Sequence, residues 1–445
     1  MKFRHTPLAS SLALLLACAT GVLAQQPGPQ RLTLKDAIAL ALKNNLGVLV
    51  AGTRVDEVQG TRERQLAQLL PHASGDALAN LQNRNLQAAG IIFPGLPVVV
   101  GPFSYYDFRL FANQSLVDRQ AYHAWKASQS QEQAAKLDYQ DTRDLVVRQT
   151  ASLYLQAQYA WAEVQATESR VVTSQALEKL ARDQRANGLA TGVDVLRAQV
   201  QLARDQQNLL VAKDSYQTSL LEFERFLGLK PGSLLELAEQ LQFHRVPLPG
   251  LDQALPLALR ARSDYRSLAA QRQMLIEQQK SSHARYYPKF SLGGDYGALG
   301  RNFGTMPGIG EIQGTLSITL FDRDRNGERR ELESRLERLN RQTEDLARGI
   351  EEELRKAMLD LDSTEQQVKV TDAALVLAQQ ELKLAEDRFR NGVGDNIEVI
   401  TAQDALAAAQ DDRIAALARH ADARMALARA LGASEKGYEQ YLPQP

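Results

Sequence analysis

The sequence predicts a mainly α fold, in which long antiparallel coiled-coil helical hairpins are joined to four membrane β-strands per chain. Three observations support this prediction. Residues 118–187 contain neither glycine nor proline, which permits an unbroken helix of about 105 Å at 1.5 Å per residue. Short segments alternate apolar and polar residues, which is the period of a β-strand. Most of the chain, finally, occurs twice, as two related halves.

Residues 1–24 have the composition of a secretory signal peptide. Lys2 and Arg4 precede an apolar run that begins at Leu12, and Ala24 fits the small residue before a cleavage site. Cleavage would remove two basic residues and no acidic ones, so the net charge would fall from −1 to −3. Such a balance indicates no nucleic-acid partner. No run of about 18 apolar residues follows the signal, so no transmembrane helix is expected.

Cys18 is the only cysteine in the sequence, and it lies inside the signal segment. A chain cut after Ala24 therefore has no thiol, no disulfide and no cysteine metal site. Two interpretations of Cys18 stay open. It is either an ordinary apolar residue of the signal or the acylated residue of a lipoprotein box, which "LLAC" (15–18) resembles. Leu16 is bulkier than the residue usually found there, which favours the first interpretation.

The two halves align at two constant offsets. At an offset of 217, "LTLKDAIALALKNN" (32–45) falls on "PGLDQALPLALRAR" (249–262), and Pro71 falls on Pro288. At an offset of 204, Asn187-Gly188 falls on Asn391-Gly392 and Leu227-Gly228 falls on Leu431-Gly432. The expected organisation is a first repeat over 31–243 with helices, two strands and a helical hairpin, a proline-rich linker over 244–250, a second repeat over 251–435 and a C-terminal tail over 436–445.

The predicted long helices carry apolar residues with a seven-residue period. The first half has a row of large residues: Val195, Leu202, Leu209, Tyr216 and Phe223. Asp205 interrupts the partner row. The second half has an unbroken row of alanines: Ala402, Ala409, Ala416, Ala423 and Ala430. A strict heptad imposes left-handed supercoiling, and alanine lets helix backbones approach closely, so both rows favour tightly packed antiparallel helices.

The strands are predicted from period-two alternation. The clearest apolar row is Ile312, Gly314, Leu316, Ile318 and Leu320. Similar rows begin at Phe290 and Tyr106, whereas a fourth strand near 73–81 is rich in alanine and glycine and only weakly indicated. Windows 93–111 and 286–321 hold 12 of the 27 Phe, Trp and Tyr residues. Membrane strands carry aromatic girdles of this kind, although soluble strands are aromatic-rich too.

Four strands cannot close a barrel. Lipid offers no water to the unpaired N–H and C=O groups of an open sheet edge, so a chain that supplies four strands must share a barrel with other copies. Two copies would give eight strands and little lumen, whereas three would give twelve strands and a pore. We therefore expect three or more copies to form a conduit.

These residues resemble the outer membrane efflux protein family of TolC-like channels. The resemblance covers residues 31–435 and is carried by "LTLKDAIALALKNN", by Pro71 and Pro288, and by the turns "NGLATGVDVLRAQ" and "NGVGDNIEVITAQ". It implies a homotrimer in outer-membrane lipid, with a 12-stranded barrel and an α-helical tunnel across the periplasm. It also implies a periplasmic adaptor (membrane fusion) protein and an inner-membrane transporter of RND or ABC type. The expected function is a passive exit duct for small molecules or proteins.

The resemblance places the periplasmic tip and the adaptor docking site at the two turns, in Asn187, Gly188, Leu189, Gly192, Asn391, Gly392 and Val393. It places a candidate entrance gate at Asp194, Phe389, Glu398 and Thr401, where ringed carboxylates would repel one another and attract cations. Thr191 to Asp194 and Asp395 to Glu398 also each predict a helix cap with an acid three residues later. Three departures from the family pattern argue against a latch like that of TolC: Thr401 replaces an acid, Phe389 lacks a hydroxyl and Gly394 replaces an arginine.

No enzyme class is indicated. The six histidines show no metal-ligand spacing, and no phosphate loop, nucleophile elbow or Cys–His arrangement occurs. We expect no catalytic residue, no metal and no cofactor. A different class of function, a periplasmic coiled-coil scaffold without a pore, would use the same helices. An outer-membrane location and conductance of the oligomer would distinguish a duct from that scaffold.

Overall fold

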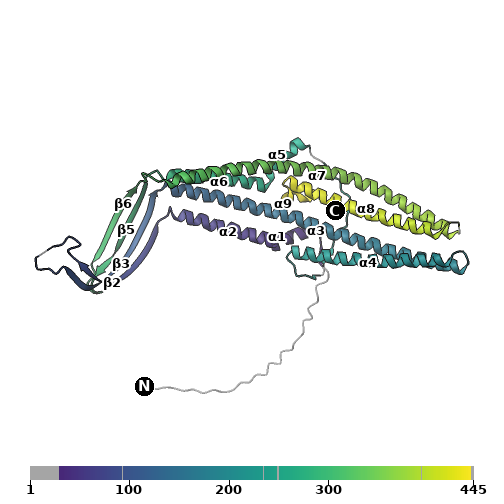
Figure 1. The fold of residues 1–445 in the computed structure, drawn as a ribbon, viewed down its shortest axis with the longest axis horizontal. Helices are drawn as coiled ribbons and strands as arrows, with labels where there is room; N and C mark the ends of the chain where they lie inside the picture. The colour runs from purple at the N-terminus through teal and green to yellow at the C-terminus, as the bar shows by residue number, and fades with distance from the viewer. Residues whose placement is uncertain (1–29, 93, 234, 248–249, 392, 442–445) are drawn as a thin grey trace, which may run out of the picture.

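The computed structural model describes residues 30–441 except 93, 234, 248, 249 and 392. The signal segment 1–24 and Cys18 lie outside these residues. The chain is long and narrow, with a β-sheet at one end and helices along the rest of its length (Figure 1). None of the described helices combines the length and the apolar character that crossing a bilayer requires.

The same succession of elements occurs twice along the chain. The first half contains α1 (Leu34–Asn44), α2 (Leu46–Ala67), β2 (His72–Asn85), β3 (Val99–Val117), α3 (Arg119–Ala186) and α4 (Gly192–Phe226). The second half contains α5 (Leu251–Ala261), α6 (Ser263–Ala284), β5 (Lys289–Gly300), β6 (Gly308–Ser317), α7 (Asp324–Arg390) and α8 (Asn396–Ala430). The remaining elements are β1 (Gln30–Leu32), β4 (Leu235–Leu237), α9 (Ser434–Gly437) and the 3-10 helix η1 (Tyr438–Tyr441).

The four long strands form one antiparallel sheet in the order β2-β3-β5-β6. The weakly predicted strand near 73–81 is present as β2 and runs further, to Asn85. Leu110 of β3 pairs with Tyr296 of β5, and Ile312 of β6 lies one row along on the same face. These three side chains are exposed, so one face of the sheet is apolar and uncovered in a single chain. The opposite face carries polar residues such as Arg109 and Asp295.

Helix α3 is as long as the absence of glycine and proline predicted, 68 residues, and α7 has 67 residues although it contains Gly327 and Gly349. Near the sheet α3 packs beside α2 and α6, and towards the opposite end it packs against α4, while α7 packs against α8 (Figure 1). The alanine row of α8 is buried throughout its length, which confirms the predicted close helix packing. Asp205 does not interrupt the packing of α4, because its buried carboxylate accepts a hydrogen bond from Ser174.

The main core lies midway along the molecule, where α1, α3, the end of α4 and the short β1–β4 ladder meet. Tyr154 and Phe223 are fully buried there, and the Tyr154 hydroxyl donates to the Leu32 carbonyl at 3.1 Å. Gly228 ends α4 with a φ of +72°, and an added Cβ would come within 2.7 Å of the Asn44 carbonyl oxygen. Gly432 ends α8 with a φ of +71°, and an added Cβ would come within 2.9 Å of the Arg262 backbone nitrogen.

Candidate functional site: the tip of the two helical hairpins

The turn between α3 and α4 forms a Schellman-type helix end. Gly188 adopts a φ of +73°, and the Leu189 N–H donates to the Gln184 carbonyl at 2.9 Å. The Gly188 N–H also donates to the Arg185 carbonyl at 3.0 Å. Two carbonyls at the end of α3 that have no partner within the helix are therefore hydrogen-bonded. Asn187 is the C-cap of the helix. The predicted turn chemistry thus forms, and it leaves the Leu189 side chain exposed.

The next helix begins with the predicted capping box. The Thr191 N–H donates to the Asp194 carboxylate at 2.8 Å, and the Asp194 N–H donates to the Thr191 hydroxyl at 3.3 Å. The Thr191 side chain and N–H together hold the pKa of the Asp194 carboxyl below its usual range. Gly192, the first residue of α4, faces the guanidinium of Arg185, which an added Cβ would meet at 3.6 Å.

The turn between α7 and α8 is built differently. Asn391 is the C-cap of α7, the Val393 N–H donates to the Arg388 carbonyl at 3.0 Å, and Gly392 lies outside the described residues. The Asp395 side chain caps α8. The Glu398 carboxylate forms no capping-box hydrogen bond with the Asp395 N–H and instead accepts one from the Arg388 guanidinium at 3.1 Å. The expectation that Glu398 completes a cap of the same kind is wrong. A threonine hydroxyl at the N-cap can donate to the acid three residues later, whereas the carboxylate of Asp395 repels the carboxylate of Glu398.

The four candidate gate residues occupy different environments. Phe389 is buried among Leu177, Leu382 and Val399, so its ring helps to form the joint between hairpins. Thr401 is exposed, and its hydroxyl donates to the Ile397 carbonyl within α8 at 2.8 Å. Glu398 is exposed beside Arg388, and Asp194 is held in its capping box. Within one chain, these residues do not converge on a single point.

Two residues that the sequence analysis did not select tie the hairpins together at the tip. The fully buried Asn396 amide donates to the Asp194 carbonyl at 2.8 Å. The buried Gln184 amide donates to the Phe389 carbonyl at 2.9 Å. Gln184 lies seven residues after Leu177, so a polar residue at an apolar heptad position was the available signal. We call Asn396 and Gln184 the tip joint.

A second polar joint between the hairpins lies further from the tip. Arg170 of α3 donates to the Ala407 carbonyl of α8 at 3.1 Å and pairs with Asp411. Gln201 of α4 donates to Asp404 of α8 at 3.3 Å. A cavity of about 60 Å³ lies between these pairs. Both joints are chains of hydrogen bonds, which fix an arrangement and carry no reactive group.

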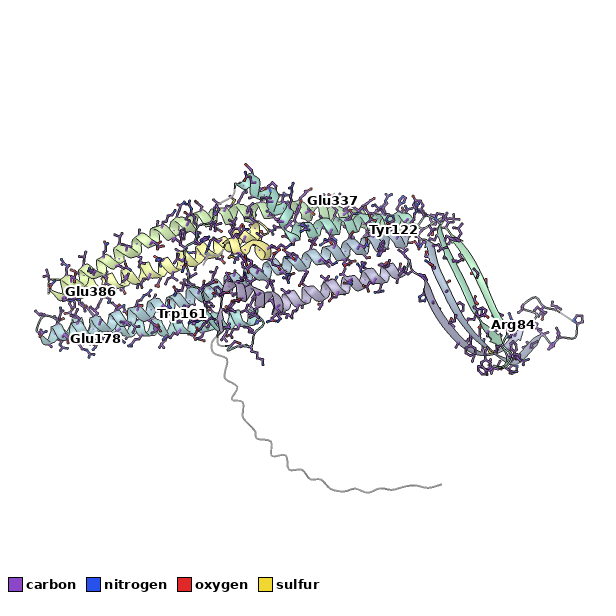
Figure 2. The ribbon with its side chains drawn as sticks, turned by 180° about the vertical axis from the view of Figure 1, so that it is seen from behind. Arg84, Tyr122, Trp161, Glu178, Glu337 and Glu386 are labelled. Atoms are coloured by element: carbon purple, nitrogen blue, oxygen red, sulfur yellow. The ribbon has the colours of Figure 1, made fainter. Side chains whose placement is uncertain are left out.

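Among the residues that the structure describes, no group of histidine, cysteine, aspartate or glutamate side chains could hold a metal ion. A hollow of about 790 Å³ lies against the sheet and is lined mainly by small and apolar residues, including Gly75, Ala112 and Gly294. The ends of the two hairpins lie far from it, near Glu178 and Glu386 (Figure 2).

Comparisons with known proteins agree with this architecture. No curated protein matches the chain. Among solved structures, VceC from Vibrio cholerae is 19% identical with a TM-score of 0.78, over 90% of this chain and 96% of that one. The CmeC outer membrane channel of Campylobacter jejuni is 15% identical with a TM-score of 0.77, over 92% and 89%. The MtrE outer membrane channel of Neisseria gonorrhoeae is 16% identical with a TM-score of 0.76, over 91% and 90%.

A family model also matches most of the chain. The model of the family described as outer membrane efflux protein matches residues 37–229 and 254–433. These two segments contain both sets of helices and strands, including both turns at the tip. The chain therefore belongs to the outer membrane efflux protein family, a family of outer-membrane transport channels rather than of enzymes.

Proposed function

We propose that three copies of this chain form the outer-membrane component of a tripartite efflux or type I secretion system. In this role the protein is a passive exit duct for small molecules or proteins. One observation carries the proposal: β2 and β6, the outer strands of the sheet, each have an edge without a neighbouring strand in the described part of the chain. Lipid cannot satisfy those peptide groups. Strands from two further copies would satisfy them and enclose a pore.

The two faces of the sheet support this arrangement. The face with Leu110, Tyr296 and Ile312 suits lipid, and the face with Arg109 and Asp295 suits water. Helix α3 begins two residues after β3 ends. A barrel of such strands would therefore continue directly into a helical tunnel.

We further propose that residues 31–243 and 251–435 are two repeats joined by the linker 244–250 and followed by the tail 436–445. The repeated order of elements supports this division. Gly228 and Gly432 also support it, since they end equivalent helices in the same conformation and approach the equivalent residues Asn44 and Ala261.

The adaptor would dock on the tip. Several exposed side chains there are large and apolar, namely Leu189, Val193, Val393 and Ile397. Apolar groups in an exposed patch with a polar rim are typical of protein interaction sites. An inner-membrane transporter of RND or ABC type would then be connected through the adaptor.

The entrance would open by separation of the two hairpins of each copy. The tip joint opposes this movement, because Gln184 and Asn396 link α3 and α4 to α7 and α8. Glu398 and Thr401, exposed on α8, are the candidates that would face the entrance. Phe389 would act only as packing.

Conductance of the reconstituted oligomer in planar bilayers tests the proposal. The double variant Gln184→Ala/Asn396→Ala should conduct several-fold more than the parent, because each lost buried hydrogen bond favours the separated hairpins by about 1 kcal/mol. Gln366→Ala is the control, since the Gln366 amide donates only to Asp362 of its own helix. Equal conductance of parent and double variant would remove the tip joint from the gate. An oligomer that never conducts would instead support the scaffold function.

A further inference from the structure

A belt of basic and aromatic side chains surrounds the junction between the sheet and the helices. The Arg119 guanidinium lies 4.7 Å from the ring centroid of Tyr287. The Arg325 guanidinium lies 3.6 Å from the ring centroid of Tyr286. Both tyrosines lie just before β5, at the end of the sheet where the helices begin. Cation–π contacts keep each guanidinium close to a ring without using its N–H groups as donors to another side chain.

The first turns of α3 extend the belt. Lys126 lies 5.3 Å from the ring of Trp125 and 5.9 Å from that of Tyr122. Tyr122 is exposed beside the sheet (Figure 2). We define the basic belt as residues 116–126, 283–289 and 321–330.

Charge in the basic belt is strongly unbalanced. It contains eight arginines and lysines but four acids, in a chain whose net charge is −1. All four acids are occupied, because Lys289 pairs with Asp118 and Arg285 lies within ion-pair distance of Asp322, Asp324 and Glu328. Other cations of the belt form no ion pair within the described residues: Arg119, Lys126, Arg323, Arg325 and Arg330. A surface that keeps so many cations unpaired has a strong attraction for anions.

An exposed apolar surface adjoins the belt on the side of the sheet. Leu316, Leu320 and Phe321 are 70%, 87% and 84% exposed, and Phe290 pairs with Leu316 on the same face. Moving from the sheet to the helices, the surface thus changes from apolar to aromatic and then to basic. Lipid shows the matching order of acyl chain, interface and charged headgroup.

We propose that the basic belt binds the phosphate groups of anionic phospholipids in the membrane leaflet that faces the periplasm. Arginine donates two hydrogen bonds to one phosphate group. A phospholipid headgroup at the belt would supply the anionic partner that these cations lack within the chain. A cation close to an anionic membrane surface contributes about 1 kcal/mol, or roughly fivefold in binding. The inference rests on the outer-membrane location and on the orientation of the proposed duct, and not on conductance, cargo or gating.

Lipid competition tests the proposal. The detergent-purified oligomer is equilibrated with equal amounts of phosphatidylglycerol and phosphatidylcholine of identical acyl chains, and the lipids retained per copy are counted by native mass spectrometry. The parent should retain phosphatidylglycerol several-fold in excess, and the excess should shrink as salt is raised. In Arg119→Gln/Arg325→Gln the two lipids should be retained almost equally.

Two further variants make the outcome decisive. Arg341→Gln/Arg390→Gln removes the same charge from exposed positions outside the belt and should keep the parent preference. Arg119→Lys/Arg325→Lys keeps the charge and should retain most of it. No preference in the parent, or the same preference in Arg119→Gln/Arg325→Gln, would overturn the proposal. The latter result is also expected if a neighbouring copy covers the belt. Conductance of the same samples reports on the duct separately.

Discussion

At the scale of single residues, equivalent positions in the two turns use their carboxylates differently. Asp194 and Glu398 align at the offset of 204, yet Asp194 closes a capping box while Glu398 pairs with Arg388. The N-cap residue decides the difference, because Thr191 has a hydroxyl and Asp395 has a second negative charge. Sequence spacing alone predicted two equal caps. It did not include the repulsion between the acids.

Thr191→Ala should loosen the start of α4. Loss of an N-cap hydroxyl costs about 1 kcal/mol, so the amide of Asp194, which donates to Thr191 at 3.3 Å, should exchange its hydrogen several-fold faster. Thr191→Ser keeps the hydroxyl and should exchange at nearly the parent rate. Equal protection in the alanine and serine variants would contradict the role of the side chain.

His420 gives the helical region a pH dependence. Its Nε2–H donates to the His244 carbonyl at 3.0 Å, and Nδ1 contacts the Thr364 hydroxyl at 3.2 Å. Burial, with a smaller contribution from Arg424, lowers the pKa of His420. The unfolded chain then binds a proton more readily than the folded chain. Stability should therefore fall as the pH drops from about 6.5 towards the lower folded pKa.

Thermal unfolding of the helices in detergent checks this expectation. The parent should lose its stability advantage over His420→Asn as the pH falls from 7 to about 5, because asparagine does not titrate there. A constant difference in midpoint across that range would show that folding does not change the pKa of His420.

At the scale of elements, residue patterns predicted which helices and strands form, but they did not always predict where each one ends. The absence of glycine and proline gave the length of α3, and the alanine heptad gave the buried seam of α8. β2 was only weakly predicted because its own residues have little strand preference. Its pairing with β3 from His72 to Asn85 depends on the neighbouring strand rather than on β2 itself.

Gly228 and Gly188 each end a helix, and a comparison of the two separates the cost of backbone strain from the cost of a close contact. Both have a φ near +72°, but only Gly228 has a neighbour, the Asn44 carbonyl, within 2.7 Å of an added Cβ. Gly188→Ala should cost about 1 kcal/mol from backbone strain alone. Gly228→Ala should cost about 2–3 kcal/mol, because α1 must also move away.

The measurement is the unfolding midpoint of the two variants in the same detergent. Gly432→Ala should behave like Gly228→Ala, since its added Cβ would meet Arg262 at 2.9 Å. A shift for Gly188→Ala as large as that for Gly228→Ala would show that strain dominates and that the close helix contact is unimportant.

At the scale of the whole molecule, the duplication and the sharing of a sheet stay predictions from the sequence, and the tip joint is a contact that the sequence analysis missed. Gln184 and Asn396 meet carbonyls about 200 residues away in the chain. Such contacts depend on how the two hairpins lie against each other, which no local period specifies. A polar residue at an apolar heptad position indicates a partner without identifying it.

Cysteine cross-linking can count the copies that share the sheet. Ala77→Cys on β2 is combined in turn with Gly310→Cys, Ile312→Cys or Gly314→Cys on β6, all on the apolar face. Cys18 is the only natural cysteine, so the background is low. If β6 of one copy lies beside β2 of the next, one combination should bring the two Cα atoms within about 4.4–6.8 Å and form a disulfide.

Oxidised samples should then show covalent dimers and trimers and nothing larger, because a closed ring of twelve strands offers three junctions. Products that end at the dimer would indicate a barrel of eight strands with little lumen, and a continuous ladder would indicate an open assembly. Phe108→Cys paired with the same β6 positions is the control, since β2 and β5 flank β3 on both sides. Cross-linking of that control would show that the sheet edges are not the surfaces that meet.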